Sequence, residues 1–260
     1  MKDQELQRYH VPNLDRALAI LELLAQHPGG LSMVEIAGLL EFPNNSVYRI
    51  TSTLFNHGYL NREEHSKRFS LSRKLLALGY ASLNEKNIIE MSIDIMRQLR
   101  DATKETVLLA TLLTDSMVVL EQVPGSHPFK FMVDAGSRLD LHTSAPGKAL
   151  LAYMPKAELD PIITHMKMPR FNEHTITTKG SYRKELTKVK AQGYAVDWGE
   201  QLEGVHCVGA PIFNERTYPM AAIWITGPRD RLPESSFETL GQRVIDHANR
   251  ISQRFGHNLL

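Results

Sequence analysis

The stretch SMVEIAGLLEFPNNSVYRITSTLFNHGYLNR, residues 32–62, carries the clearest structural pattern of this 260-residue chain. Ser32 and Glu35 have the spacing of a capping box, in which each side chain binds a free amide at a helix start. Pro43 suits the first turn of a second helix. The inward-facing residues of that helix recur at helical spacing: Val47, Ile50 and Leu54. Two short helices joined by a tight turn predict a helix-turn-helix.

The flanking segments extend this motif. An amphipathic helix is expected before it, with apolar residues at Leu14, Ala17, Leu18, Leu21 and Leu24. Asn13 is expected to cap that helix, and Pro28-Gly29-Gly30 to end it. After the motif, residues 58–62 and 68–71 alternate around Glu63–Lys67, which predicts a β-hairpin with a basic tip. A hairpin in this position is the wing of a winged helix.

The outer face of the second helix has the side chains that DNA recognition requires. Asparagine pairs with adenine, arginine with guanine, and hydroxyl groups with phosphates or base edges. No carboxylate, which would repel the DNA backbone, occurs between Asn44 and Arg62. The candidate DNA-binding residues on this helix and on the wing are Asn44, Asn45, Ser46, Tyr48, Arg49, Ser52, Lys67 and Arg68.

The net charge of +1 conceals a local asymmetry. Residues 1–43 carry three Lys/Arg against six Asp/Glu, residues 44–80 carry six against two, and residues 81–260 carry 21 against 21. A basic excess confined to a short stretch is typical of a small DNA-contacting surface on a neutral body. A solvated face of a purely structural domain gives the same charge pattern.

The composition excludes several classes of protein. Apolar residues make up 42% of the chain and charged residues 23%, as in ordinary globular proteins. No apolar run approaches the roughly 18 residues of a membrane span, and the N-terminal segment lacks the apolar core of a secretory signal. The single cysteine, Cys207, cannot form an intrachain disulfide. We therefore expect a soluble, cytoplasmic protein that does not contact membranes.

Longer segments resemble the isocitrate-lyase-regulator (IclR) family of bacterial transcription regulators. The likeness begins at LDRALAILELL from Leu14, continues through EIAGLLEFPNNSVYRITSTLFNHGYL and RFSLSRKLLALG, and includes LHTSAPGKALLA from Leu141. The block GYAVDWGEQLEGVHCVGAPIFN, residues 193–214, is similar to the effector-domain signature of the family. This resemblance covers the chain from about Leu14 to Gly256.

The resemblance implies an α+β protein with two domains and a connector. These are a winged helix-turn-helix over residues 1–80, a linker helix over 81–99 and a GAF-like effector-binding domain over 100–260. A helical stripe in the connector fits either a dimer contact or packing within one domain: Ile88, Met91, Ile95 and Leu99. In the effector domain, strands are expected at 106–113, 117–123, 129–133, 194–198, 207–213 and 220–226. Helices are expected at 147–153, 181–192 and 233–255.

The resemblance also implies an effector pocket between the loop 145–147 and the sheet that carries the signature. The residues carried over to it are Ala145, Gly147, Asp197, Val205, Cys207, Trp224 and Thr226. Gly147 is expected to open a helix whose free amides favour a carboxylate or phosphate. Trp224 and Thr226 should face the same side of their strand. They stand where the best-known members carry small hydroxyl residues, so the indole is expected to shrink or reshape the pocket.

Three of these residues are also compatible with different roles. Cys207 and Trp224 fit a hydrophobic core, and Asp197 fits a cap or an ion pair. A cysteine-dependent enzyme would need His206 or His142 as the base and Asp197 to orient it, but adjacent side chains on a strand point to opposite faces. A metal-sensing regulator would need Cys207, Asp197 and a histidine, although no CxxC or HxxxH spacing is present.

The favoured hypothesis is a ligand-responsive transcription regulator, either a repressor or an activator. It would bind double-stranded operator DNA as a dimer or a dimer of dimers, with a small carboxylate, sugar acid or aromatic acid as effector. Neither a cofactor, a metal ion nor a catalytic residue is expected. For such a switch, the effector must bind the DNA-competent and DNA-incompetent states with different affinities.

Overall fold

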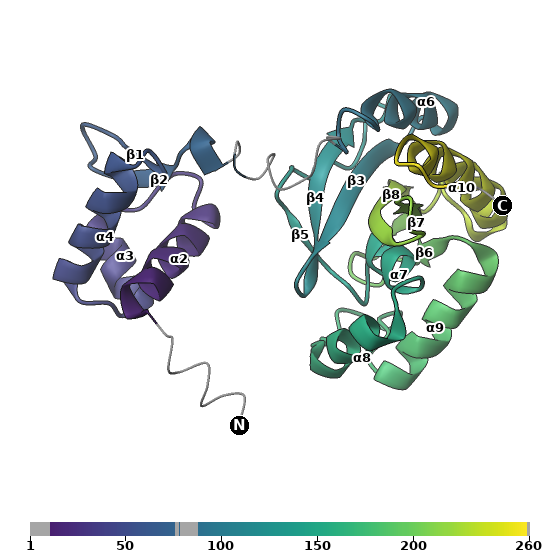
Figure 1. Ribbon diagram of the computed structural model, residues 1–260. Coiled ribbons are helices and arrows are strands. Elements are labelled where there is room, and N and C mark those ends of the chain that lie inside the picture. The colour runs from purple at the N-terminus through teal and green to yellow at the C-terminus, as the bar shows by residue number, and fades with distance from the viewer. Residues whose placement is uncertain (1–10, 76–77, 79–87, 259–260) are drawn as a thin grey trace. The chain divides into compact units, whose positions relative to one another are not determined.

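The computed structural model describes residues 11–75, 78 and 88–258. The chain divides into two compact units, Met1–Glu85 and Lys86–Leu260. Figure 1 shows a helical unit with a small hairpin and a larger unit built on one sheet. Within the described ranges, no helix is long and apolar enough to cross a membrane.

The first unit is a winged helix-turn-helix, as expected. Its described elements are α2 (Pro12–Ala25), α3 (Met33–Leu40), α4 (Asn44–Asn56), β1 (Leu60–Arg62) and β2 (Phe69–Leu71). Ser32 and Glu35 form both halves of the capping box at the start of α3. Strands β1 and β2 pair antiparallel, and Leu31 adds a further antiparallel bridge to Phe69. The three helices and β1 and β2 enclose a core centred on Ile20, Ile36 and Val47.

Two expectations for α2 were wrong. The cap residue is Val11, without a side-chain hydrogen bond, and Pro12 occupies the first turn, so Asn13 does not cap the helix. Of the expected stripe, Leu24 is buried and Ala17 and Leu21 pack on the core, but Leu14 and Leu18 are 57% and 50% exposed, whereas Ile20 is fully buried. The helix is apolar at so many positions that its sequence fits two different buried faces, and packing against α3 and α4 selects the face of Ile20.

The second unit contains a six-stranded antiparallel sheet in the order β5-β4-β3-β8-β7-β6. The strands are β3 (Thr106–Leu113), β4 (Ser116–Val123), β5 (Arg138–Asp140), β6 (Ala195–Asp197), β7 (Val205–Phe213) and β8 (Pro219–Pro228). The helices are α6 (Ile93–Thr103), α7 (Ala145–Leu151), α8 (Lys156–His165), α9 (Lys179–Gln192) and α10 (Phe237–Arg254), with a 3-10 turn at Glu234–Ser236.

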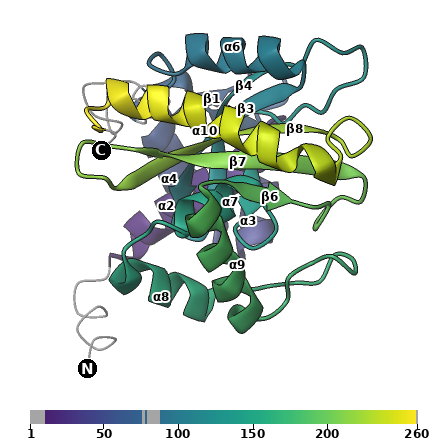
Figure 2. The ribbon, with the colours of Figure 1, turned by 90° about the vertical axis from the view of Figure 1, so that its right-hand side faces the viewer.

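Helices cover both faces of this sheet. Helices α6 and α10 pack on one face, and α7 packs on the other with α8 and α9 outside it (Figure 2). The strands alternate accordingly: in β8, Ile223 and Ile225 face α6 and α10, whereas Ala222 and Trp224 face α7. Helix α7 is buried along its whole length, so its sequence is limited to small and aliphatic residues and one lysine.

Several expected elements of this unit differ from the structure. Residues 129–133 form no strand, and β5 forms that edge of the sheet instead. The apolar side chains of Phe131 and Val133 pack on the core between the sheet and α7, which accounts for the apolar pattern of this segment. Helix α8 was missed, since it contains Pro161. In the expected linker helix, residues 81–87 lie outside the described residues, and α6 begins only at Ile93.

The apolar stripe of the expected connector is used inside the second unit. Ile88, Ile95 and Leu99 are all buried in the cluster beneath α6 and α10. The alternative of packing within one domain therefore accounts for these side chains.

Candidate nucleic-acid interface and ligand pocket

Helix α4 presents a polar outer face. Asn44, Asn45, Tyr48 and Arg49 are exposed, while Val47 and Ile50 are buried beneath them, as expected. Of the two predicted serines, both half-buried, Ser46 accepts a hydrogen bond of 3.2 Å from Arg16 Nη1. The fully buried Thr51 was missed by the sequence pattern; its hydroxyl donates to the Val47 carbonyl at 2.8 Å, which satisfies it within the helix.

The two basic wing residues have different surroundings. Lys67 is exposed in the hairpin loop and adopts a left-handed backbone conformation, with φ of 56°. Arg68 turns back to the helical part of the unit: its Nε donates to the Gly30 carbonyl at 3.1 Å, and its Nη2 lies 2.9 Å from Glu35 Oε1. Arg68 therefore ties the wing to the start of α3, whereas Lys67 is available at the surface.

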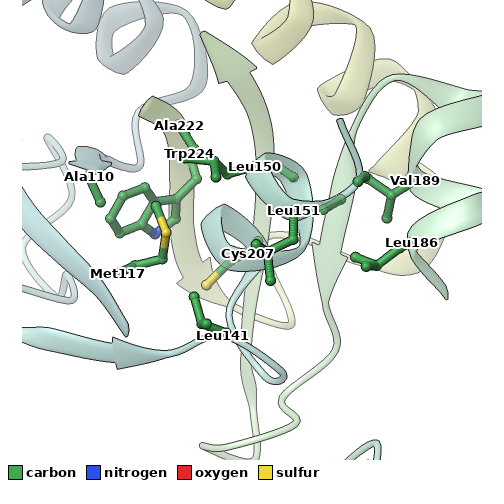
Figure 3. Close-up of a cluster of buried hydrophobic side chains, with 14 of the residues drawn as sticks. Ala110, Met117, Leu141, Leu150, Leu151, Leu186, Val189, Cys207, Ala222 and Trp224 are labelled. Atoms are coloured by element: carbon green, nitrogen blue, oxygen red, sulfur yellow. The ribbon is translucent and has the colours of Figure 1, made fainter. Parts of the chain in front are cut away.

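A cavity of about 110 Å³ lies between the start of α7 and the sheet of the second unit. Six of the seven predicted effector residues line it: Ala145, Asp197, Val205, Cys207, Trp224 and Thr226. The remaining wall comes from Phe131, Val133, Leu139, Ser144, Pro146, Gln201 and Leu202. Figure 3 shows Cys207 and Trp224 in the same hydrophobic cluster as Met117 and Leu141. An apolar wall with a few convergent polar groups is typical of a small-molecule site.

Strand register brings the polar lining residues together. Asp197 of β6 pairs with Cys207 of β7, which in turn pairs with Thr226 of β8. Residues paired in this way on neighbouring strands point to the same face of a sheet. Trp224 pairs with Gly209, where an added Cβ would lie 3.0 Å from the Trp224 Cβ. Gly209 thus leaves room for the indole to enter the layer below α7.

Burial determines the ionisation of these groups. Burial raises the pKa of Asp197, and the nearby Lys148 charge opposes this rise. Asp197 Oδ1 accepts a hydrogen bond of 2.9 Å from the Glu200 amide. Burial, followed by the Asp197 charge, raises the pKa of Cys207 far above its usual range. The thiol is therefore protonated at neutral pH, and it donates to Thr226 Oγ1 at 3.3 Å.

The geometry gives no support to a nucleophilic or metal-binding role for Cys207. His206 Nδ1 lies 2.8 Å from the Leu232 carbonyl oxygen, and His142 Nε2 lies 3.1 Å from that of Pro169. Each histidine thus engages a backbone carbonyl, and a protonated thiol without a base is a poor nucleophile. Among the residues the structure describes, no group of three or more His, Cys, Asp and Glu side chains is placed to hold a metal ion.

Gly147 does not line the cavity. Its amide donates to Ser144 Oγ at 3.3 Å, so it is not free for an anion, and α7 begins two residues earlier at Ala145. A Cβ on Gly147 would lie 2.7 Å from the Leu141 carbonyl oxygen. The glycine is required for the close approach of α7 to this backbone, and the expected helix-end anion site at Gly147 is wrong.

A buried ion pair beside the cavity was missed by the sequence analysis. Lys148 of α7 is fully buried; its Nζ donates to the Val196 carbonyl at 2.6 Å and to Glu200 Oε1. Burial raises the pKa of Glu200 to about 7, against the opposing effect of Lys148. Within the described residues, Glu200 Oε2 has no hydrogen-bond partner. A lysine within a small apolar helix was the available signal, since such a charge has to be paired.

Larger hollows lie elsewhere. One of about 500 Å³ lies between α2 and α4 and includes Asn45 and Arg49 of the outer face of α4. Another, of about 280 Å³, lies beside Trp198 and His206, and acidic, arginine and histidine side chains make up most of its lining. The smaller cavity under α7 remains the better ligand site, because buried strands supply both its apolar wall and its convergent polar groups.

A winged helix-turn-helix followed by an α/β unit with a small internal cavity defines a class, the DNA-binding transcription regulators. Residues 13–64 match the IclR helix-turn-helix domain, and residues 80–253 match the domain described as "Bacterial transcriptional regulator IclR C-terminal". The chain belongs to the IclR family, whose members are transcription regulators and not enzymes. In this family the helix-turn-helix binds DNA and the C-terminal domain takes a small effector.

Known proteins resemble the chain over nearly its whole length. It is 30% identical to the HTH-type transcriptional regulator BhcR of Paracoccus denitrificans, over 92% of this chain and 85% of that protein. An IclR family regulator from Brucella abortus has a crystal structure with 30% identity and a TM-score of 0.74, over 96% of this chain and 95% of that one. An IclR homologue from Microbacterium hydrocarbonoxydans, solved with 4-hydroxybenzoate, shares the fold at 19% identity and a TM-score of 0.80, over 94% and 98% of the two chains.

Gly147→Ala is expected to lower the free energy of unfolding by about 1–3 kcal/mol, because the added methyl group overlaps the Leu141 backbone. Gly180→Ala in α9 is the matched control: nothing lies within 4 Å of its added methyl group, and alanine is the better helix former. Chemical denaturation of both full-length variants measures the difference. Equal stabilities would show that α7 does not depend on this close contact.

The stability of the second unit is expected to depend on pH through Glu200. The folded-state pKa of Glu200, about 7, lies above its usual value of 4.5. The stability that Glu200 contributes to the folded state is therefore fully present below about pH 4.5, and it is lost as the pH rises towards 7. The difference in unfolding free energy, wild type minus Glu200→Gln, should therefore decrease from pH 5 to pH 7. Urea denaturation at both pH values measures it. A difference that increases would show that Glu200 is stabilised as the carboxylate.

Proposed function

We propose that the first unit reads an operator through α4, and that a dimer, or a dimer of dimers, engages two half-sites of an inverted repeat. The observation that carries this proposal is the outer face of α4, where exposed amides, a phenol and a guanidinium occur without any carboxylate. Asn44, Asn45, Tyr48 and Arg49 contact the major groove, and Ser46 and Ser52 lie at its edge. Paired recognition helices on a symmetric site are the usual geometry of this motif.

The wing adds contacts that do not depend on base sequence. Lys67 approaches a phosphate from the hairpin loop, where its exposed side chain is free to reach out. Arg68, which was expected to bind DNA, holds the hairpin on α3 through Gly30 and Glu35. Phosphate contacts of this kind set the salt dependence of binding rather than the preferred sequence.

The effector occupies the cavity under α7 in this proposal. Ala145, Val205 and Trp224 provide its apolar wall, and Asp197, Cys207 and Thr226 its polar groups. In this proposal, effector binding in the cytoplasm changes the spacing or orientation of paired DNA-binding units. Such a change requires an effector that prefers one of the two states.

Arg49→Ala is expected to weaken binding to a preferred DNA sequence by about 1–3 kcal/mol, since a bidentate contact to guanine is lost. A preferred sequence is first selected from a random duplex library with the wild-type protein. Fluorescence anisotropy then compares that duplex with a scrambled one. The control, Arg216→Ala, removes the same charge from an exposed turn of the second unit and should affect neither duplex. An equal loss on both duplexes would assign Arg49 to a phosphate.

Lys67→Asn is expected to reduce the slope of log K against log salt by about one unit without altering the preferred sequence. Asparagine tolerates the left-handed backbone at this position, so the hairpin should be retained. Anisotropy titrations between 50 and 200 mM salt, roughly the range in which such slopes are resolved, provide the measurement. Lys156→Asn on α8 is the charge control. An unchanged slope would place the tip of the wing away from DNA.

A further inference from the structure

We infer that the cavity under α7 selects a small uncharged molecule that donates hydrogen bonds, such as a hydroxyamide or a polyol, over the corresponding carboxylate. This inference rests on the proposal that the cavity is the effector site, and it revises the acid effector expected from the sequence. Three features of the lining support it: its charge, its backbone amides and its size.

The charged groups at the cavity favour a hydrogen-bond donor. Among its described lining residues there is no Lys, Arg or His, and Asp197 is the only carboxylic acid. Lys148, whose charge acts on Asp197, is fully buried and already held by Glu200 and the Val196 carbonyl. A carboxylate ligand would therefore meet a like charge without a free cation, which costs free energy in a partly buried site. A ligand N–H or O–H group would instead donate to Asp197.

The backbone at the start of α7 is a poor anion site. Pro146 has no amide hydrogen, and the Gly147 amide is bound to Ser144 Oγ. The Ser144 hydroxyl donates to the Asp140 carbonyl at 2.6 Å, so its hydrogen is not available to a ligand. Of the first three residues of α7, only Ala145 has a backbone amide left for an anion. A helix end binds an anion through several amides together.

The size of the cavity limits the ligand. An apolar cavity of about 150 Å³ admits benzene. The cavity here has about 110 Å³ and is narrowed by the indole of Trp224. This space fits a molecule of roughly five or six non-hydrogen atoms. Thr226 Oγ1 accepts from the Cys207 thiol, so its own hydroxyl hydrogen can serve a ligand carbonyl.

Matched pairs of probes test the selectivity of the full-length protein. Glycolamide and lactamide have the same shape as glycolate and lactate but carry no charge. In isothermal titration calorimetry we expect each amide to bind at least about tenfold more tightly than its acid, the ratio that one unpaired buried charge readily produces. Equal or tighter binding of the acids would overturn the inference, as would the failure of both amides to bind.

Two variants assign the selectivity to its causes. Pro146→Ala restores a backbone N–H group, and Asp197→Asn removes the like charge. Each variant should therefore reduce the ratio of the affinity for the amide ligand to the affinity for the corresponding acid. Asp230→Asn, an exposed carboxylate of the second unit, is the control for net charge and should leave the ratio unchanged. If neither cavity variant changes the ratio, the selectivity does not arise from this site.

The outcomes for this inference and for the proposed function can be separated. Operator binding by the ligand-free protein, measured with the wild type and Arg49→Ala, tests the DNA-binding role alone. Amides that bind selectively without affecting operator affinity would refute the effector role and leave the selectivity of the cavity standing. Acids that bind selectively and release the operator would confirm the effector role and refute the ligand class inferred here.

Discussion

The buried ammonium group of Lys148 is the constraint around which the second unit is arranged. A charge without access to water has to be paired. Its partners come from the middle of β6, through the Val196 carbonyl, and from the segment that follows this strand, through Glu200. Helix α7 is therefore fixed to the segment that carries Asp197. Because the cavity lies between these two elements, the ion pair sets the relative position of its two walls.

The sequence predicted the fold well where only one arrangement satisfies the pattern. Strands β3, β7 and β8 alternate between two cores, and the capping box marks the start of α3 without ambiguity. Where two arrangements fit, the prediction failed. Helix α2 is apolar on more than one side, and residues 129–133 alternate like a strand but have no neighbouring strand with which to pair. Tertiary contacts decide such cases, and these are not local in the sequence.

The candidate sites were predicted to different extents for a similar reason. Asp197, Cys207 and Trp224 stand at recognisable positions of a signature and its neighbouring strand, and they do line one cavity. The roles of Lys148 and Arg68 depend on partners 52 and 33 residues away in sequence, which no local pattern identifies. Gly147 was assigned to ligand binding because glycine at a helix start has two uses, and here it permits close packing.

The tie between Arg68 and the start of α3 has a consequence for how the wing folds. An isolated two-stranded hairpin is only marginally stable in water, and β1 and β2 have three residues each. The bridge from Leu31 to Phe69 and the contacts of Arg68 with Gly30 and Glu35 attach this hairpin to the loop before α3 and to the first turn of that helix. The order of the wing is thus linked thermodynamically to the helix-turn-helix core. The surface proposed to bind DNA is thus assembled as one cooperative unit, in which residues outside α4 and the hairpin loop share control of its shape.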